Sequence, residues 1–170
     1  MLLLTVIASP AVAQHTDTDW SRFSAALAFG YAEGKAATLA QYRITTSPTT
    51  KQAADAALDE LDRRASEARN AFLRVQKLGS PFWSAAATVR VGDMFACQAM
   101  VIRAIPVPAK LAATLPPRAL VEYRAVMFGL AEPLLREAND SWEGAMADHA
   151  SAYWTAQARQ RLQDGAVPGC

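Results

Sequence analysis

The sequence predicts an all-α fold of about five helices, stacked as antiparallel hairpins in a single domain. Alanine, leucine, arginine, glutamate and glutamine are abundant, and these residues favour helices. Apolar residues recur at steps of three and four along most of the chain, which is the helical period. Short stretches rich in proline, glycine, serine or threonine separate these periodic segments and are expected to form turns.

The composition also limits the class of protein. The chain has 170 residues, of which 52% are hydrophobic and 19% charged, enough apolar material for the core of one domain. The 17 Lys and Arg residues nearly balance the 16 Asp and Glu residues, so the formal net charge is +1. Proteins that bind nucleic acids carry clustered basic charge, so this balance argues against that class.

The first 13 residues form a separate unit. They carry no charge, and they end in Ala11-Val12-Ala13, an A-x-A pattern typical of signal-peptidase sites. We therefore predict a signal peptide at 1–13, cleaved before Gln14, and export to the periplasm. No basic residue precedes the apolar run, which leaves a start upstream of Met1 and a buried N-terminal helix as alternatives. A membrane span needs about 20 apolar residues, more than this segment offers.

The first predicted helix spans about residues 17–42. One face carries Trp20, Phe23, Leu27, Tyr31 and Thr38, which recur at helical spacing. Gly30 and Gly34 lie on or near that face, where missing side chains allow a neighbouring helix to approach closely. Because Glu33 and Lys35 share the same turn, we predict close packing inside a soluble protein rather than in lipid.

The second predicted helix begins near Thr50, whose hydroxyl can cap it, and ends near Leu78, before Gly79. Its apolar residues form a heptad seam of Ala54, Leu58, Leu61, Ala65, Ala68, Phe72 and Val75. Charged residues cover the other sides, as on a solvated surface. The narrow seam with its alanines favours an antiparallel neighbour at close range.

The third predicted helix, about residues 81–104, is apolar on most faces and is expected to be the buried centre of the domain. Ser80 and Pro81 suit its first turn, and the prolines that follow Ile105 prevent its continuation. Arg90 and Asp93 are three residues apart, so we expect an ion pair that ties this helix to its neighbours. Gly92, between them, permits a close helix crossing.

Residues 105–117 are rich in proline and are predicted to form a crossover loop. A fourth helix begins near Pro116, with a buried stripe of Leu120, Tyr123, Met127, Leu130, Leu134, Ala138, Trp142 and Ala145. Pro133 falls inside this pattern, and because the stripe keeps its phase on both sides we predict a kink there rather than an end. A fifth helix is predicted at about 150–163.

The two cysteines, Cys97 and Cys170, match no disulfide framework and no metal-binding spacing. Cys97 lies in the apolar third helix, where cysteine usually acts as a small hydrophobic residue. Cys170 ends a glycine- and proline-containing stretch, 166–170, that is predicted to be a flexible tail. We expect free, inert thiols; in an oxidising compartment the two can pair, or Cys170 can link two chains.

No recognisable catalytic or metal-binding motif is present, so we predict that the protein is not an enzyme and carries no cofactor or metal. His15 and His149 belong to no zinc, haem or di-iron pattern, and the chain has neither a phosphate-binding glycine loop nor a G-x-S-x-G motif. Three tryptophans could form an aromatic cage, but their positions on helix faces are explained by core packing without any ligand: Trp83, Trp142 and Trp154.

The segment Val89-Arg90-Val91-Gly92-Asp93-Met94-Phe95 resembles the first helix of a tetratricopeptide repeat. The likeness extends from about Thr50 to Leu162 and includes, in order, Phe82-Trp83, Ile105-Pro106-Val107-Pro108, Tyr123-Arg124, Ala131-Glu132-Pro133-Leu134, Trp142 and Trp154. This region is similar to the C-terminal helical module of large envelope tetratricopeptide-repeat proteins, including those of gliding-motility machinery. The resemblance implies a TPR-like stack of helices that acts as a non-catalytic adaptor of the cell envelope.

We therefore expect the mature domain, residues 14–165, to be a periplasmic scaffold that binds envelope proteins in a groove between helices. No nucleic-acid partner and no stable membrane span after signal cleavage are expected. The alternative is a small-ligand-binding domain with a site between the second, third and fourth helices, where polar side chains such as Arg90 and Gln98 would converge in an enclosed cavity.

Overall fold

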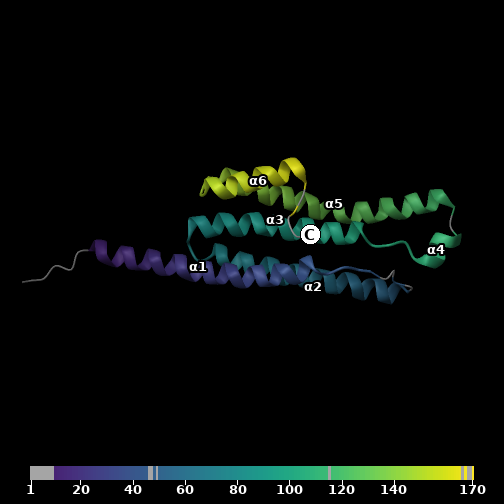
Figure 1. Ribbon diagram of the computed structural model, residues 1–170, viewed down its shortest axis with the longest axis horizontal. Helices are drawn as coiled ribbons and strands as arrows, with labels where there is room; N and C mark the ends of the chain where they lie inside the picture. The colour runs from purple at the N-terminus through teal and green to yellow at the C-terminus, as the bar shows by residue number, and fades with distance from the viewer. Residues whose placement is uncertain (1–9, 46–47, 49, 115, 166, 168–169) are drawn as a thin grey trace, which may run out of the picture.

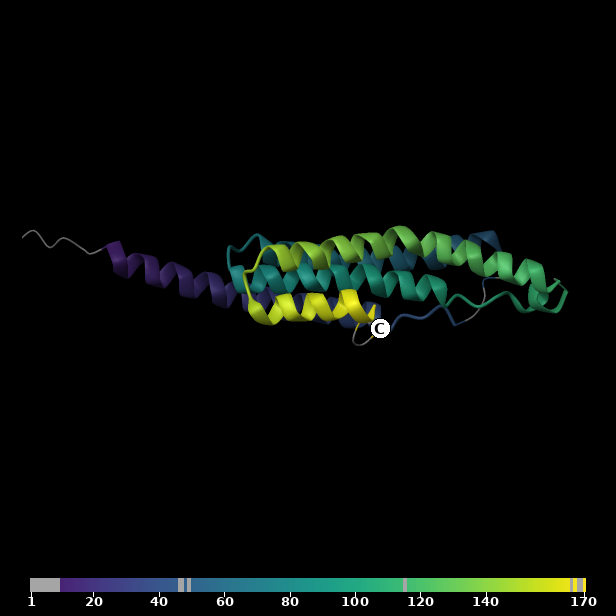
Figure 2. The same cartoon turned by 90° about the horizontal axis from the view of Figure 1, so that it is seen from above.

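The computed structural model is an elongated bundle of helices, and it describes residues 10–45, 48, 50–114, 116–165, 167 and 170 (Figures 1 and 2). The described part of the chain is all-α and contains no strand, as predicted. Its helices are α1 (Pro10–Ala40), α2 (Lys51–Gln76), α3 (Pro81–Arg103), α4 (Ala109–Thr114), α5 (Pro117–Ala147) and α6 (Ala152–Asp164). The short α4 lies within the stretch predicted as a crossover loop; the other helices correspond to the five predicted ones.

Helix α3 is the centre of the bundle, with α1 and α2 on one side and α5 and α6 on the other (Figure 1). Its buried residues extend over most of its length and all its faces, from Ala85 to Ile102. Among the described residues, α3 also has the length and hydropathy of a membrane span. Because 78% of its most apolar window is buried by the other helices, it fits the role of a core helix.

The predicted seam of α2 is confirmed, with Leu61, Ala65, Ala68, Phe72 and Val75 buried against α1 and α3. Thr50 caps this helix, because its Oγ1 accepts a hydrogen bond of 3.1 Å from the Ala53 amide. After α2 ends, Gly79 adopts φ +73°, a left-handed conformation that glycine accepts without strain, and the chain reverses into α3.

Helix α1 buries the opposite face from the one that the aromatic residues suggested. The residues packed on α2 and α3 are Ala25, Phe29, Ala32, Ala36 and Leu39, whereas Trp20, Phe23, Leu27 and Tyr31 are 56–68% exposed. The expected close neighbour at Gly30 and Gly34 is also wrong within this chain, since a Cβ at either position would meet nothing within 4 Å. Alanines on the buried face allow the helices to approach closely.

Helix α5 lies along α3 and continues through Pro133, as predicted. Its predicted stripe needs one correction, because Leu130 is 50% exposed and the neighbouring Ala131 is buried instead. The small side chain of Ala131 allows α5 to approach α3 closely at this level. Further along, Ala138, Trp142 and Ala145 are buried as predicted.

The predicted signal peptide falls mostly outside the described residues, and Pro10–Ala13 form the start of α1. That part of α1 projects beyond the bundle (Figure 2). At the other end of the chain, Val167 is 7% exposed and Cys170 is bonded to Cys97, so at these two positions the expected flexible tail is anchored on the bundle. Ala166, Pro168 and Gly169 lie outside the described residues.

Candidate functional site

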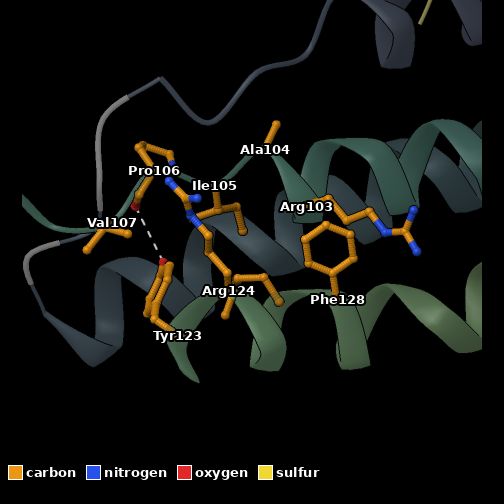
Figure 3. A pocket seen from close by; sticks show the side chains of 9 residues that line it. Arg103, Ala104, Ile105, Pro106, Val107, Tyr123, Arg124 and Phe128 are labelled. Carbon is orange, nitrogen blue, oxygen red and sulfur yellow. Dashed lines mark hydrogen bonds between the residues drawn. The ribbon is translucent and has the colours of Figure 1, made fainter. Parts of the chain in front are cut away.

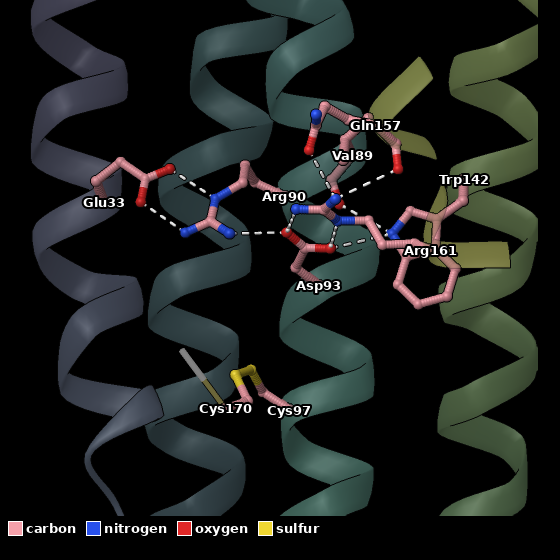
Figure 4. Close-up of polar contacts among 9 residues, drawn as sticks. All are labelled: Glu33, Val89, Arg90, Asp93, Cys97, Trp142, Gln157, Arg161 and Cys170. Atoms are coloured by element: carbon pink, nitrogen blue, oxygen red, sulfur yellow. Dashed lines mark hydrogen bonds and ion pairs between the residues drawn. A yellow bond between two sulfur atoms is a disulfide. The ribbon is translucent and has the colours of Figure 1, made fainter. Parts of the chain in front are cut away.

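A buried ionic network crosses the bundle at the level of Asp93, which is fully buried on α3 (Figure 4). The predicted ion pair is confirmed, with Arg90 Nη1 2.7 Å from Asp93 Oδ2. From α6, Arg161 Nε donates to Asp93 Oδ1 at 2.8 Å, and from α5 the Trp142 indole N–H is shared between that oxygen and the Val89 carbonyl, each at 3.2 Å. The carboxylate is therefore bound by side chains from three helices.

Each arginine in the network has a second acceptor. Arg90 forms a two-pronged pair with Glu33 of α1, with both N···O distances at 2.6 Å. Arg161 Nη1 donates to the side-chain oxygen of Gln157 at 2.9 Å. Burial opposes the charge of Arg90, but hydrogen bonds to Glu33 and the charge of Asp93 raise its pKa above the ordinary value.

This network joins four helices, α1, α3, α5 and α6, and its charged groups satisfy one another. A buried charge without a counter-charge is costly, whereas groups that are fully paired fix the relative positions of the elements that carry them. We therefore assign these residues a structural role. Sequence spacing identified Arg90 and Asp93, but Glu33, Gln157 and the buried position of Arg161 were missed because they lie far away along the chain.

The predicted ligand anchors Arg90 and Gln98 have separate contacts. Arg90 reaches α1, whereas Gln98 turns toward α2, where it accepts a hydrogen bond of 2.7 Å from Arg69 and donates to Asp62 at 3.2 Å. The guanidinium of Arg69 also lies 4.4 Å from the centre of the Phe95 ring. The two residues thus contribute to different helix–helix contacts rather than to one site.

The three tryptophans also divide between two places. Trp83 and Trp154 border Phe29, with ring centres 5.0 and 6.1 Å away, in an aromatic cluster at the start of α3 and α6. Trp142 instead contacts Asp93 in the ionic network. The tryptophans therefore do not converge on one cage. His149 is exposed in the turn between α5 and α6, and the side chain of His15 lies outside the described residues.

The expectation of free thiols is wrong, since Cys97 and Cys170 form a disulfide with a Cα–Cα distance of 5.5 Å. Cys97 lies one helical turn after Asp93 on α3 (Figure 4). The carbonyl of Cys170 accepts a hydrogen bond of 3.0 Å from Arg43 Nη2, so the chain end is tied to both α3 and the segment after α1. Their separation of 73 residues gave no sequence signal for this pairing.

An open groove of about 390 Å³ lies where α3 ends and the crossover faces the first half of α5 (Figure 3). We call it the exit groove; its lining residues are Arg103, Ala104, Ile105, Pro106, Val107, Tyr123, Arg124, Met127 and Phe128. The Tyr123 hydroxyl donates to the Pro106 carbonyl at 3.4 Å, which holds the crossover against α5. Burial raises the pKa of the Tyr123 phenol above its ordinary value, so this donor stays protonated at neutral pH.

The exit groove is positively charged. Arg103 lies with its guanidinium carbon 4.6 Å from the centre of the Phe128 ring, and Arg124 borders the other side of the groove. Neither arginine has a carboxylate of the described residues within ion-pair distance. By contrast, Arg118 and Arg136 of α5 pair with Glu122 and Glu132. The groove therefore offers two guanidinium groups beside an apolar floor.

Among the described residues, no group of three or more His, Cys, Asp or Glu side chains is placed to hold a metal ion. Comparison with known proteins found no matching family model, no matching curated protein and no matching solved structure. The resemblance to envelope tetratricopeptide-repeat modules therefore stays a prediction from the residues that suggested it.

Proposed function

We propose that this protein is a non-catalytic interaction module of the cell envelope, and that a segment of another protein binds in its exit groove. The proposal depends on one observation, the pairing of an apolar floor with two arginines that have no carboxylate from the described residues. Arginine and aromatic residues are enriched at the energetically important centres of protein interfaces. A groove with this lining fits a partner segment that carries its own carboxylates.

The chemistry of the groove defines the segment. Arg103 and Arg124 suit one or two carboxylates, since a guanidinium binds a carboxylate through paired hydrogen bonds. The stacking of Arg103 on Phe128 holds one guanidinium in place before the partner arrives. Apolar side chains of the segment would contact Val107 and Met127. We therefore expect an acidic segment with at least one large apolar residue next to its carboxylate.

The surroundings of the groove leave room for a protein. Helix α6 covers only the second half of α5 (Figure 1). The first half carries four large apolar side chains that are at least half exposed: Val121, Val126, Phe128 and Leu130. Apolar surface of this kind, beside a polar rim, is typical of interaction sites.

Two further features support the location and the role. The predicted signal peptide and the Cys97–Cys170 disulfide both favour an exported protein, because disulfides persist in oxidising compartments. The resemblance to envelope repeat proteins implies an adaptor. A small carboxylate ligand is the second candidate, since the groove volume falls in the range of about 300–1,000 Å³ that such ligands occupy.

The test compares two double variants that remove the same charge. Arg103→Gln with Arg124→Gln alters the exit groove, whereas Arg136→Gln with Arg159→Gln alters exposed arginines elsewhere on α5 and α6. The three proteins are used to capture binders from envelope extracts of the source organism. We expect the wild type and the control variant to capture at least one protein in stoichiometric amount. The groove variant should capture at least about fivefold less of that protein. Equal capture by all three proteins, or recovery of a bound metabolite and no protein, would contradict it.

A further inference from the structure

The outward face of α1 has the pattern of a helix–helix interface, although no part of the described chain covers it. Counted in heptads, the core positions of this face are filled by Trp20, Phe23, Leu27, Gly30, Gly34 and Ala37, which we call the α1 seam. Trp20, Phe23 and Leu27 are 68%, 56% and 61% exposed. Gly30 and Gly34 are exposed as well, with open space where their Cβ atoms would lie.

The α1 seam carries no charged residue. Two charged residues of this part of α1 already have contacts inside the bundle: Glu33 binds Arg90, and Lys35 binds Glu67 of α2 at 3.1 Å. The face that packs on the bundle lies on the opposite side of α1, at Ala25, Phe29, Ala32, Ala36 and Leu39. The seam is uncharged and exposed, and the opposite face of α1 is already buried against the bundle. This pattern indicates that a second helix packs on the exposed face.

The order of large and small residues along the seam points to one occupant. Its first half holds the three large side chains, and its second half holds two glycines and an alanine. When two copies of α1 pair antiparallel, Trp20 can face Ala37 of the partner subunit, Phe23 can face Gly34 of the partner subunit, and Leu27 can face Gly30 of the partner subunit. Every large side chain then meets a small one, and the two-fold axis repeats each contact.

A parallel pair lacks this fit. It would place Trp20 against Trp20 of the partner subunit at one end and glycine against glycine at the other. The first contact is crowded, and the second leaves a gap where packing should be dense. The sequence of the seam is therefore complementary to itself in only one of the two directions.

We propose that two copies of this chain associate through the α1 seam, with their α1 helices antiparallel. Stable interfaces bury about 800 Å² on each partner, and an aromatic side chain contributes on the order of 150–250 Å² when fully buried. Four large side chains would enter the interface: the three of the seam and the flanking Tyr31, which is 59% exposed. Because the bundle already covers part of each, they would bury less than their full area, so the interface is small. The dimer is accordingly reversible, with a Kd on the order of micromolar.

The first test is the oligomeric state of the full chain, measured by sedimentation velocity from about 1 to 100 µM, around the Kd expected above. Leu27→Glu places a charge at the centre of the seam and should raise the Kd at least about tenfold. The matched control is Leu73→Glu, which makes the same substitution at a 41% exposed leucine of α2 and should leave the Kd within about twofold. A wild-type protein that stays monomeric over this range, or a Leu27→Glu variant that dimerises as well as the control, would overturn the proposal.

The second test reads the direction of the helices. A Phe23→Cys chain and a Gly34→Cys chain, carrying tags of different size, are mixed and oxidised. Antiparallel pairing predicts a cross-link between the two different chains. Cross-links that form only between identical chains would indicate a parallel pair and would contradict the register described here.

Discussion

At the scale of single residues, the core contains a carboxylate with no solvent-accessible surface. Asp93 is 0% exposed, and its two guanidinium neighbours, Arg90 and Arg161, are both largely buried. Arg90 and Asp93 could be paired from the sequence because their spacing brings them together on one helix turn. Arg161 is 68 residues further along, so no local pattern identifies it, and only the packing of α6 on α3 does.

Asp93→Asn should destabilise the protein strongly. The substitution keeps the size of the side chain but removes its charge, which leaves Arg161 in a buried position without a counter-charge. Removing one partner of a buried ion pair typically lowers the unfolding free energy by about 3–5 kcal/mol. Urea denaturation followed by circular dichroism measures this change.

The matched control for that substitution is Glu132→Gln on α5. It removes a carboxylate whose pair with Arg136 is solvent-exposed, at 64% for both side chains. Its effect should stay within about 0.5 kcal/mol, since exposed ion pairs contribute little. Equal midpoints for the two variants would show that the Asp93 network does not stabilise the fold.

A pH dependence follows from Glu60 on α2. Hydrogen bonds from Arg63 and Arg64 lower the pKa of its carboxyl group from 4.5 to about 2 in the folded protein. The folded pKa lies below the unfolded one, so Glu60 stabilises the fold fully above about pH 4.5, and this contribution is lost as the pH falls toward 2. Glu60→Gln should therefore show a shallower loss of stability over this range, measured as the urea midpoint against pH.

Because Glu60 and its two arginine partners lie at the protein surface, its effect should be small and should weaken further in high salt. Glu143→Gln, which alters another exposed carboxylate, serves as the control and should follow the wild-type curve. Parallel pH curves for wild type and Glu60→Gln at low salt would count against the role of the Arg63 and Arg64 contacts.

At the scale of helices, periodicity predicted where the elements lie more reliably than which face they bury. The seam of α2 was predicted residue by residue because its other faces are charged. Helix α1 has two apolar faces at helical spacing, and the face with the larger side chains is the exposed one. Sequence periodicity cannot choose between two such faces, since the choice depends on which one the neighbouring helices fit.

The crossing of α3 and α5 depends on Gly92. A Cβ at this position would lie 2.5 Å from Trp142 Nε1, 2.7 Å from its Cδ1 and 3.0 Å from the Ala138 carbonyl oxygen. Gly92→Ala would push the indole away, and its hydrogen bonds to Asp93 and the Val89 carbonyl would be lost. We expect a loss of about 2–4 kcal/mol, from overpacking together with an unpaired buried donor.

Gly144→Ala is the control for the crossing, and it should act in the opposite direction. Gly144 is an exposed residue within α5, and a Cβ there would meet nothing within 4 Å. Alanine is the better helix former by roughly 0.5–1 kcal/mol, so this variant should be slightly more stable than wild type. Thermal unfolding of both variants measures the contrast, and destabilisation by both would refute a specific close contact at Gly92.

At the scale of the whole molecule, the exit groove and the α1 seam lie on parts of the bundle that the other helices leave uncovered. The groove was missed in the sequence because the crossover appeared only as a proline-rich connection. Its arginines become a pair when the crossover folds back on α5, where Tyr123 contacts the Pro106 carbonyl. Prolines thus marked the end of α3 in the sequence, but the position of the crossover depends on tertiary contacts.

The disulfide should contribute to the stability of the whole bundle. It connects Cys97, in the second half of α3, with Cys170 and thereby closes a loop of 73 residues that includes the crossover, α5 and α6. A cross-link over a loop of this length restricts the unfolded chain, and chain-entropy estimates place the stabilisation at about 4 kcal/mol. Cys170→Ser should therefore lower the urea midpoint of the protein purified without reductant.

Reductant provides the decisive comparison for the disulfide. Dithiothreitol should lower the midpoint of the wild type to that of Cys170→Ser and leave the variant unchanged, because the variant has no bond to break. The wild type should also resist thiol alkylation under denaturing conditions until it is reduced. If both cysteines of the protein purified without reductant react with the alkylating agent before reduction, the anchoring of the chain end on α3 is not covalent. The attachment must then depend on Val167 and on the hydrogen bond from Arg43 to the Cys170 carbonyl.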